Sequence, residues 1–66
     1  MGLRWSDVHE IAIELAESHP AVDPCFINFV DLMSWVIELD GFEDDPSRCG
    51  EKVLEAIQMA WIEEQS

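Results

Sequence analysis

The sequence predicts a small, mainly α-helical domain of three helices spanning residues 1–66, with little or no β-structure. Apolar residues recur at helical spacing in three segments, and proline or glycine residues separate those segments. Hydrophobic residues make up 48% of the chain, which argues for a folded core rather than disorder. Three helices can pack as a simple bundle or in a helix-turn-helix arrangement, and the periodicity does not choose between the two.

The first helix is expected to begin after Ser6 or Asp7 and to end near Ser18. Asp7 and Glu10 have the spacing of a capping box, in which two side chains satisfy backbone N–H groups of the first turn. Pro20 disfavours the helical conformation of the residue before it, which sets the end of the helix. Apolar residues at intervals of three and four predict the buried stripe: Val8, Ile11, Ala12 and Leu15.

The second helix is expected over residues 31–39, after a short turn that begins at Asp23-Pro24. An extended step is expected between them, at Phe29-Val30. Gly41 is a natural stop for this helix, and Phe42 is expected to anchor the following loop to the core. The buried face is predicted by the clearest helical repeat in the chain: Leu32, Trp35, Val36 and Leu39.

The third helix is expected to begin between Pro46 and Glu51 and to run to about Glu64. It follows a compact acidic loop, Glu43-Asp44-Asp45-Pro46, in which Asp-Pro again has the pattern of a helix start. The buried face of this helix is predicted by its apolar repeat: Val53, Leu54, Ile57, Ala60 and Trp61.

A chain of 66 residues can bury only a small core. The three tryptophans are the largest side chains available to fill it. We expect Trp35 and Trp61 to be its main apolar anchors. Trp5 precedes the first helix and is expected to fasten the N-terminal segment to the core.

Charge narrows the range of partners. Fifteen Asp and Glu residues face three Lys and Arg residues, which gives a net charge of −12. Such a field repels phosphate groups and attracts cations and basic protein surfaces, so we expect no binding to nucleic acid or to a membrane. The chain shows no secretory signal and no apolar run long enough to span a bilayer, and a cytoplasmic location is therefore expected. We also expect the protein to be a monomer.

The acidic residues fall into two groups. One follows the first predicted helix at spacings of three and four: Asp7, Glu10, Glu14 and Glu17. The other surrounds the end of the second helix and the acidic loop: Glu38, Asp40, Glu43, Asp44 and Asp45. The ordinary interpretation of such groups is a solvated face. Five acids for each base, however, leave few partners within the chain, and a cation or a basic protein would relieve the repulsion.

Carboxylates one turn apart could hold Fe²⁺, Mn²⁺ or Ca²⁺ weakly, with water completing the shell, and no tightly bound cofactor is expected. The candidate metal ligands are Asp7, Glu10, Glu14, Glu17, Glu43, Asp44 and Asp45. The candidate partner-binding residues are Asp7, Glu10, Glu14, Glu38, Asp40, Glu43, Asp44 and Asp45. A calcium loop that starts at Asp45 fails, because Ala56 stands where the bidentate glutamate is needed.

The two cysteines and two histidines do not have zinc-ligand spacing. Structural zinc sites in small domains contain close ligand pairs, and neither the pair His9 and His19 nor the pair Cys25 and Cys49 is close in sequence. No motif supports a nucleophilic Cys–His pair, although catalysis by such a pair is a third hypothesis to be tested. The chain is therefore expected not to be an enzyme.

Several segments of the chain resemble the IscX (YfhJ) family, and the resemblance covers essentially the whole length. They are the opening Met-Gly-Leu-Arg-Trp-Ser-Asp, then Phe29-Val-Asp-Leu-Met-Ser-Trp35, Phe42-Glu-Asp-Asp-Pro46, Glu51-Lys-Val-Leu-Glu-Ala-Ile57 and Trp61-Ile-Glu-Glu. The resemblance implies a small helical fold related to the winged helix. It also implies a role in the bacterial iron–sulfur cluster assembly system.

The same resemblance implies partners. Family members bind the cysteine desulfurase of the assembly system and bind iron through acidic surface residues, and the scaffold protein is a further possible partner. Glu43, Asp44 and Asp45 lie in the family's Phe-acidic-Asp-Asp-Pro motif, while Asp7 and Glu10 lie in its N-terminal motif. The leading hypothesis is an acidic adaptor or regulator of the desulfurase. The alternative is an iron-binding donor that delivers Fe²⁺ to the scaffold.

Overall fold

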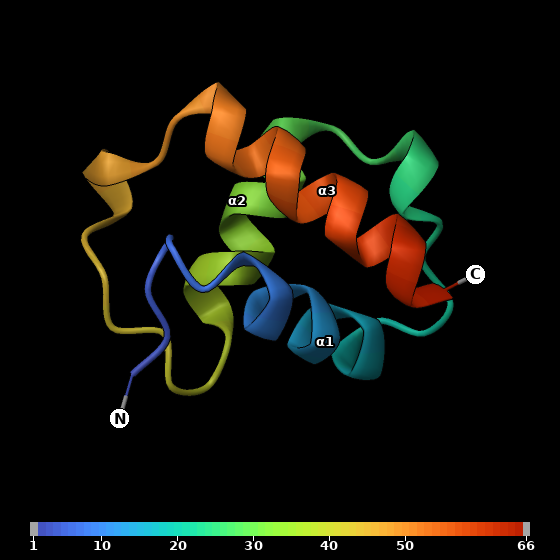
Figure 1. Cartoon of the computed structure of the whole chain (residues 1–66), viewed down its shortest axis with the longest axis horizontal. Helices are drawn as coiled ribbons and strands as arrows, with labels where there is room; N and C mark the ends of the chain where they lie inside the picture. Colours follow the sequence, from blue (N-terminus) through green and yellow to red (C-terminus); the bar gives the residue numbers. More distant parts are fainter. Residues whose placement is uncertain (1, 66) are drawn as a thin grey trace.

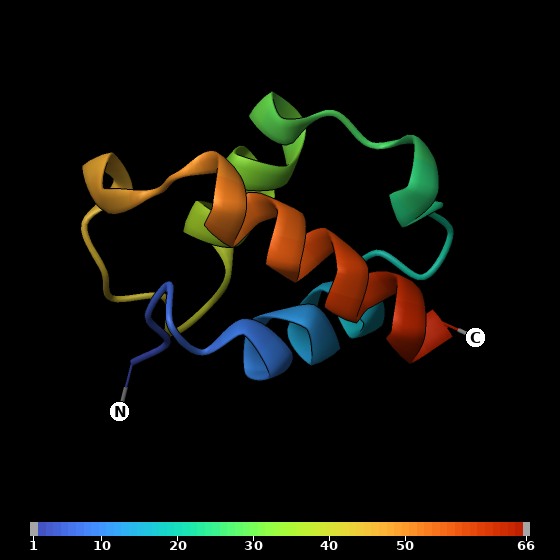
Figure 2. The same cartoon turned by 45° about the horizontal axis from the view of Figure 1, so that its top comes forward.

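The computed structural model describes residues 2–65, and within them the chain forms three α-helices and two short 3₁₀ helices. In both views α1 and α3 lie side by side, with α2 set across them (Figure 1, Figure 2). The elements are α1 (Val8–Ser18), η1 (Pro24–Phe26), α2 (Phe29–Glu38), η2 (Pro46–Arg48) and α3 (Glu51–Gln65). The expected fold class, mainly α with three helices and little β-structure, is confirmed.

The core is formed by the inner faces of the three helices. The predicted stripes of α1 and α3 are buried except at their first apolar residues, Val8 and Val53, which are half-buried. On α2, Leu32 and Val36 are fully buried, whereas Trp35 and Leu39 are only partly covered. The hydrophobic effect of these faces, rather than propensity, holds such short helices together.

The N-terminus of α2 differs from the prediction. The helix begins at Phe29, so the expected extended step at Phe29-Val30 is wrong, and the extended residues are Ile27 and Asn28. The reason is a cap: Asn28 Oδ1 accepts the backbone N–H of Asp31 at 2.8 Å, and Asn28 Nδ2 donates to the Asp31 carboxylate at 3.1 Å. An asparagine in this position satisfies a backbone donor that the first turn leaves free.

The capping box predicted for α1 is also wrong. Asp7 stands at the N-cap position, but its side chain makes no bond to the helix. Instead, its carboxylate turns back and accepts the backbone N–H of Arg4 at 3.0 Å. The end of the helix at Ser18 and the stop at Gly41, which adopts a φ of 92°, agree with the prediction.

The N-terminal segment is fastened to the loop after α2, and the two lie together in both views (Figure 1, Figure 2). Leu3 donates its N–H to the carbonyl of Gly41 and accepts the N–H of Glu43 at 2.9 Å, which makes the one parallel bridge seen in residues 2–65. The rings of Trp5 and Phe42 pack edge-to-face with their centroids 4.8 Å apart. Trp5 thus anchors the N-terminal segment and Phe42 anchors the loop, as predicted. Trp5 is only 4% exposed.

The other two tryptophans differ from each other. Trp61 is fully buried, as predicted for a core anchor. Trp35 is half-buried at the edge of the core, where the His19 ring stacks on it at 4.5 Å. The core therefore rests on Trp61 and Trp5, with Trp35 covering its rim.

Candidate partner-binding surface

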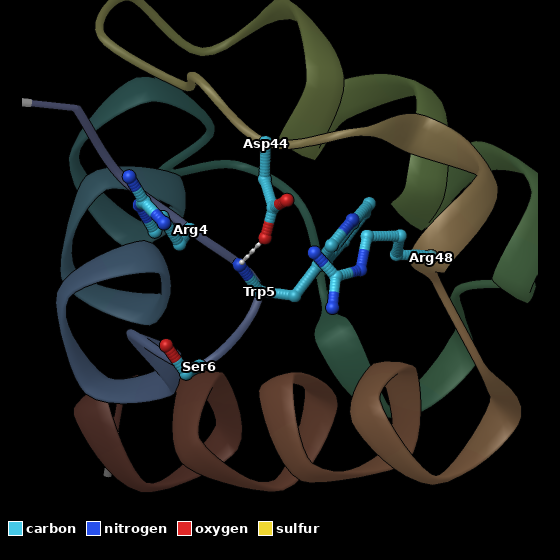
Figure 3. A pocket seen from close by; sticks show the side chains of 5 residues that line it. All are labelled: Arg4, Trp5, Ser6, Asp44 and Arg48. Atoms are coloured by element: carbon cyan, nitrogen blue, oxygen red, sulfur yellow. Dashed lines mark hydrogen bonds between the residues drawn. The ribbon is translucent and has the colours of Figure 1, made fainter.

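The acidic loop after α2 is a hydrogen-bonded structure. Asp44 accepts the backbone N–H of Trp5 at 3.0 Å through one carboxylate oxygen and that of Asp45 at 2.7 Å through the other. Figure 3 shows the first of these bonds, which joins residues far apart in the chain. The indole N–H of Trp5 donates to the Asp45 carbonyl at 2.9 Å. Both carboxylate oxygens of Asp44 therefore accept hydrogen bonds that stabilise the fold.

Asp45 and Glu43 are engaged as well. One Asp45 oxygen accepts both the backbone N–H and the hydroxyl of Ser47, at 2.9 and 2.8 Å, and so caps η2. The side chain of Glu43 lies over Gly2 so closely that a Cβ at Gly2 would overlap it. Glu43, Asp44 and Asp45 thus all contribute to the junction between the N-terminal segment and the loop.

Electrostatics agrees with this structural role. Hydrogen bonds from the backbone of Trp5 and then Asp45 lower the pKa of Asp44, and the charges of Arg48 and Arg4 lower it further. The backbone and hydroxyl of Ser47 lower the pKa of Asp45. Both carboxyl groups are therefore held in the ionised form that accepts these bonds best.

The acids of α1 are placed differently. Glu10, Glu14 and Glu17 are exposed, and their carboxylates form no hydrogen bond or ion pair with the residues that the structure describes. Their spacing of three and four places them on one side of the helix, and we call these three residues the α1 stripe. Asp7 is separated from them in role, because its carboxylate is bound to the N-terminal segment.

Glu38 and Asp40 are exposed at the end of α2, and they too lack such bonds within the described part of the chain. Across residues 2–65, no group of three or more His, Cys, Asp or Glu side chains is arranged to hold a metal ion. The predicted ligands therefore occupy separate parts of the surface instead of one cage. The free carboxylates form a charged surface.

A pocket of about 290 Å³ opens beside the acidic loop. Its lining combines two cationic side chains with one acid and two residues of the N-terminal segment: Arg4, Trp5, Ser6, Asp44 and Arg48. Figure 3 shows Arg4 and Arg48 on either side of Asp44. The sequence did not lead us to predict this pocket, because the candidate site residues were all acidic side chains. With only three Lys and Arg residues in the chain, the positions of Arg4 and Arg48 were the available indication of such a site.

The two cysteines are free thiols. Cys25 is exposed, contrary to the usual placing of a lone cysteine in a core, and Cys49 is half-buried. Desolvation and the neighbouring Asp23 carboxylate raise the pKa of Cys25, and desolvation raises that of Cys49. A raised pKa keeps a thiol protonated and unreactive, which is the opposite of nucleophilic activation.

None of the helices in residues 2–65 has the length and apolar character needed to cross a membrane.

The fold and its charged surface define a class, the small acidic helical proteins. The chain belongs to the IscX (YfhJ) family, whose model, described as iron-sulphur cluster assembly, matches residues 3–66. It is also 69% identical over 64 residues to an uncharacterized protein of Pseudomonas aeruginosa, and the match covers 97% of each chain. The family assignment points to iron–sulfur cluster assembly.

Proposed function

We propose that this protein is a cytoplasmic, non-catalytic adaptor that docks onto the cysteine desulfurase and regulates cluster formation. The observation that carries the proposal is the α1 stripe, whose three carboxylates are exposed and unengaged in a chain with a net charge of −12. The repulsion among them is an unfavourable term that a basic partner surface relieves on contact.

The proposal assigns the two acidic groups separate tasks. The α1 stripe forms the docking face, together with the exposed carboxylates of Glu38 and Asp40 at the end of α2. Asp44 and Asp45 contribute indirectly, because the Asp44 carboxylate and the Asp45 backbone carbonyl hold Trp5 in the N-terminal segment that leads into α1. Exposed charges are screened over about 8 Å at physiological ionic strength, so the affinity should fall as salt rises.

The test compares two triple variants with the same net charge. In the first, the α1 stripe is neutralised by Glu10→Gln, Glu14→Gln and Glu17→Gln. In the second, three exposed acids of α3 are neutralised by Glu51→Gln, Glu55→Gln and Glu64→Gln. Binding to purified desulfurase is measured by fluorescence anisotropy from about 50 to 500 mM salt.

We expect the stripe variant to bind about tenfold more weakly and with a flatter salt dependence, and the α3 variant to stay close to wild type. Equal weakening of both variants would show that only net charge matters. Binding by the wild type that ignored salt would exclude electrostatic docking altogether.

The second candidate is iron delivery, in which Fe²⁺ is cargo for the assembly scaffold. Neighbouring carboxylates of the α1 stripe are one turn apart, and this spacing supports weak binding with water completing the shell. An iron titration of the stripe variant and of a double variant, Asp44→Asn with Asp45→Asn, distinguishes the possible ligand sets. Weaker iron binding in the double variant alone would place the ligands in the loop.

Cluster assembly decides between the two candidates. The rate of assembly on the scaffold by purified desulfurase is followed with and without this protein over a range of iron concentrations. A regulator changes the rate in proportion to desulfurase occupancy at every iron concentration. A donor raises the rate only when it is loaded with iron.

A further inference from the structure

We propose that the pocket between Arg4 and Arg48 receives a carboxylate side chain of the partner protein and thereby sets the orientation of the docked complex. The inference rests on the proposed docking to a basic protein and adds a contact of opposite sign. The acidic surface attracts the partner, and the pocket accepts one acid from it.

Most of the few basic side chains of this protein gather at the pocket. The chain has only three Lys and Arg residues, and two of them line this pocket. They come from the N-terminal segment and from η2, and the bonds between Trp5 and the acidic loop bring these two segments together. The two guanidinium groups flank Asp44 in Figure 3.

Both guanidinium groups keep their N–H donors free within the described residues. Among the residues that the structure describes, neither side chain forms a hydrogen bond or an ion pair. Asp44 lies between them, but its two oxygens already accept backbone N–H groups of Trp5 and Asp45. Each guanidinium carries five N–H donors, so this pocket has an excess of donors over acceptors.

The charges of the pocket indicate which ligand it receives. Two arginines and one aspartate give the pocket side chains a net charge of +1, within a chain of −12. A free anion is repelled by the whole chain, whereas a carboxylate carried on a basic protein surface is brought in by the attraction of its surroundings. The planar fork of arginine matches the two oxygens of a carboxylate, and the Ser6 hydroxyl adds a donor.

The test again uses variants with matched charge. The double substitution Arg4→Gln with Arg48→Gln and the single substitution Lys52→Glu both change the net charge by two negative units. Lys52 is exposed in the first turn of α3 and does not line the pocket. Binding to purified desulfurase is measured at one fixed salt concentration, and the near-ultraviolet circular dichroism of each variant checks that Trp5 remains packed.

Attraction by net charge alone predicts that both variants bind a basic partner more tightly. We expect the opposite for the pocket variant, a loss of about tenfold, with Lys52→Glu equal to wild type or tighter. If the pocket variant also binds more tightly, no carboxylate occupies the pocket and the inference is overturned, while docking itself stands. If the wild type does not bind, the proposed function fails first.

Two further measurements fix the source of the carboxylate. Substituting Gln for single Asp and Glu residues on the desulfurase should reveal one that weakens binding of the wild type but not of the pocket variant. Phosphate and acetate are titrated into the protein alone while the NMR signal of the Trp5 indole N–H is followed. Saturation by either ion at micromolar concentration would identify a site for a free anion and overturn the proposal.

Discussion

The acidic loop and the α1 stripe contain the same chemical group and use it in opposite ways. In the loop, the carboxylates of Asp44 and Asp45 are held by backbone N–H groups and a hydroxyl, and their pKa values are lowered as a result. In the stripe, the carboxylates of Glu10, Glu14 and Glu17 are exposed and unengaged within the described residues.

This contrast shows how a very acidic chain can form a stable fold. The loop satisfies its carboxylates locally, and there each negative charge stabilises the junction that it belongs to. The stripe leaves its carboxylates to solvent, where they are available to a partner. Neutralising a loop acid should therefore affect folding, whereas neutralising the stripe should affect recognition.

The largest effect on stability is expected when Trp5, which packs against the acidic loop, is replaced. Trp5→Ala removes a side chain that is 4% exposed, and the free energy of unfolding should fall by about 3–5 kcal/mol. Trp5→Phe keeps most of the packing and loses the bond from the indole N–H to the Asp45 carbonyl, which should cost about 1 kcal/mol. Urea denaturation measures both, and equal losses would mean that packing is not the main contribution of Trp5.

A smaller effect, dependent on pH, is expected from Asp44→Asn. An amide keeps one oxygen to accept a backbone N–H and presents an NH₂ group to the other donor, so one of the two bonds is lost. Because the folded-state pKa of Asp44 is lowered, its ionised carboxylate contributes its full stabilisation above the ordinary value of 3.8 and loses it as pH falls through the lowered pKa.

The difference in unfolding free energy between wild type and Asp44→Asn should therefore be constant near neutral pH and shrink in acid. Thermal denaturation at a series of pH values measures it. A difference that persisted unchanged well below the ordinary pKa would mean that the charge of Asp44 plays no part in stability.

The stripe variant should have almost no effect on folding. Glutamine is a comparably good helix former, and the loss of like charges offsets any loss of favourable interactions, so the unfolding free energy should change by less than about 0.5 kcal/mol. The same variant is expected to bind the desulfurase about tenfold more weakly. A stripe variant that unfolded as easily as Asp44→Asn would break the distinction between the two acidic groups.

The smallest effect is expected from the cysteines. Cys25→Ser with Cys49→Ser should leave the cluster assembly rate unchanged, because raised pKa values keep both thiols protonated at neutral pH. A loss of assembly activity in this double variant would support the hypothesis of a catalytic Cys–His pair.

The sequence predicted the helical core well because periodicity reports which side of a helix is buried. The stripes of Ile11 with Leu15 and of Ile57 with Trp61 follow from spacing alone. The start of α2 was predicted wrongly because a cap depends on one side chain, Asn28, whose effect the Asp-Pro pattern upstream concealed. A cap is a local signal, and it could have been found.

Which acids are hydrogen-bonded within the fold and which are free could not have been predicted in the same way. The bond from the Trp5 backbone to Asp44 joins residues 39 positions apart, and no local pattern encodes such a contact. The arginine pocket depends on that bond, because it exists only once the N-terminal segment lies against η2. Recognition of the family motif located the acids, but their hydrogen bonds decide which of them are free.

The packing of α1 against α3 has a consequence for synthesis on the ribosome. Residues Val8–Ser18 find their main packing surface in Glu51–Gln65, which is translated roughly forty residues later. At about 5–20 residues per second, the apolar face of α1 waits for about 2 to 8 s before it can be covered. We expect the mutual repulsion of its acids to help keep the nascent chain apart from other nascent chains during that interval, a use of the net charge that is separate from any partner.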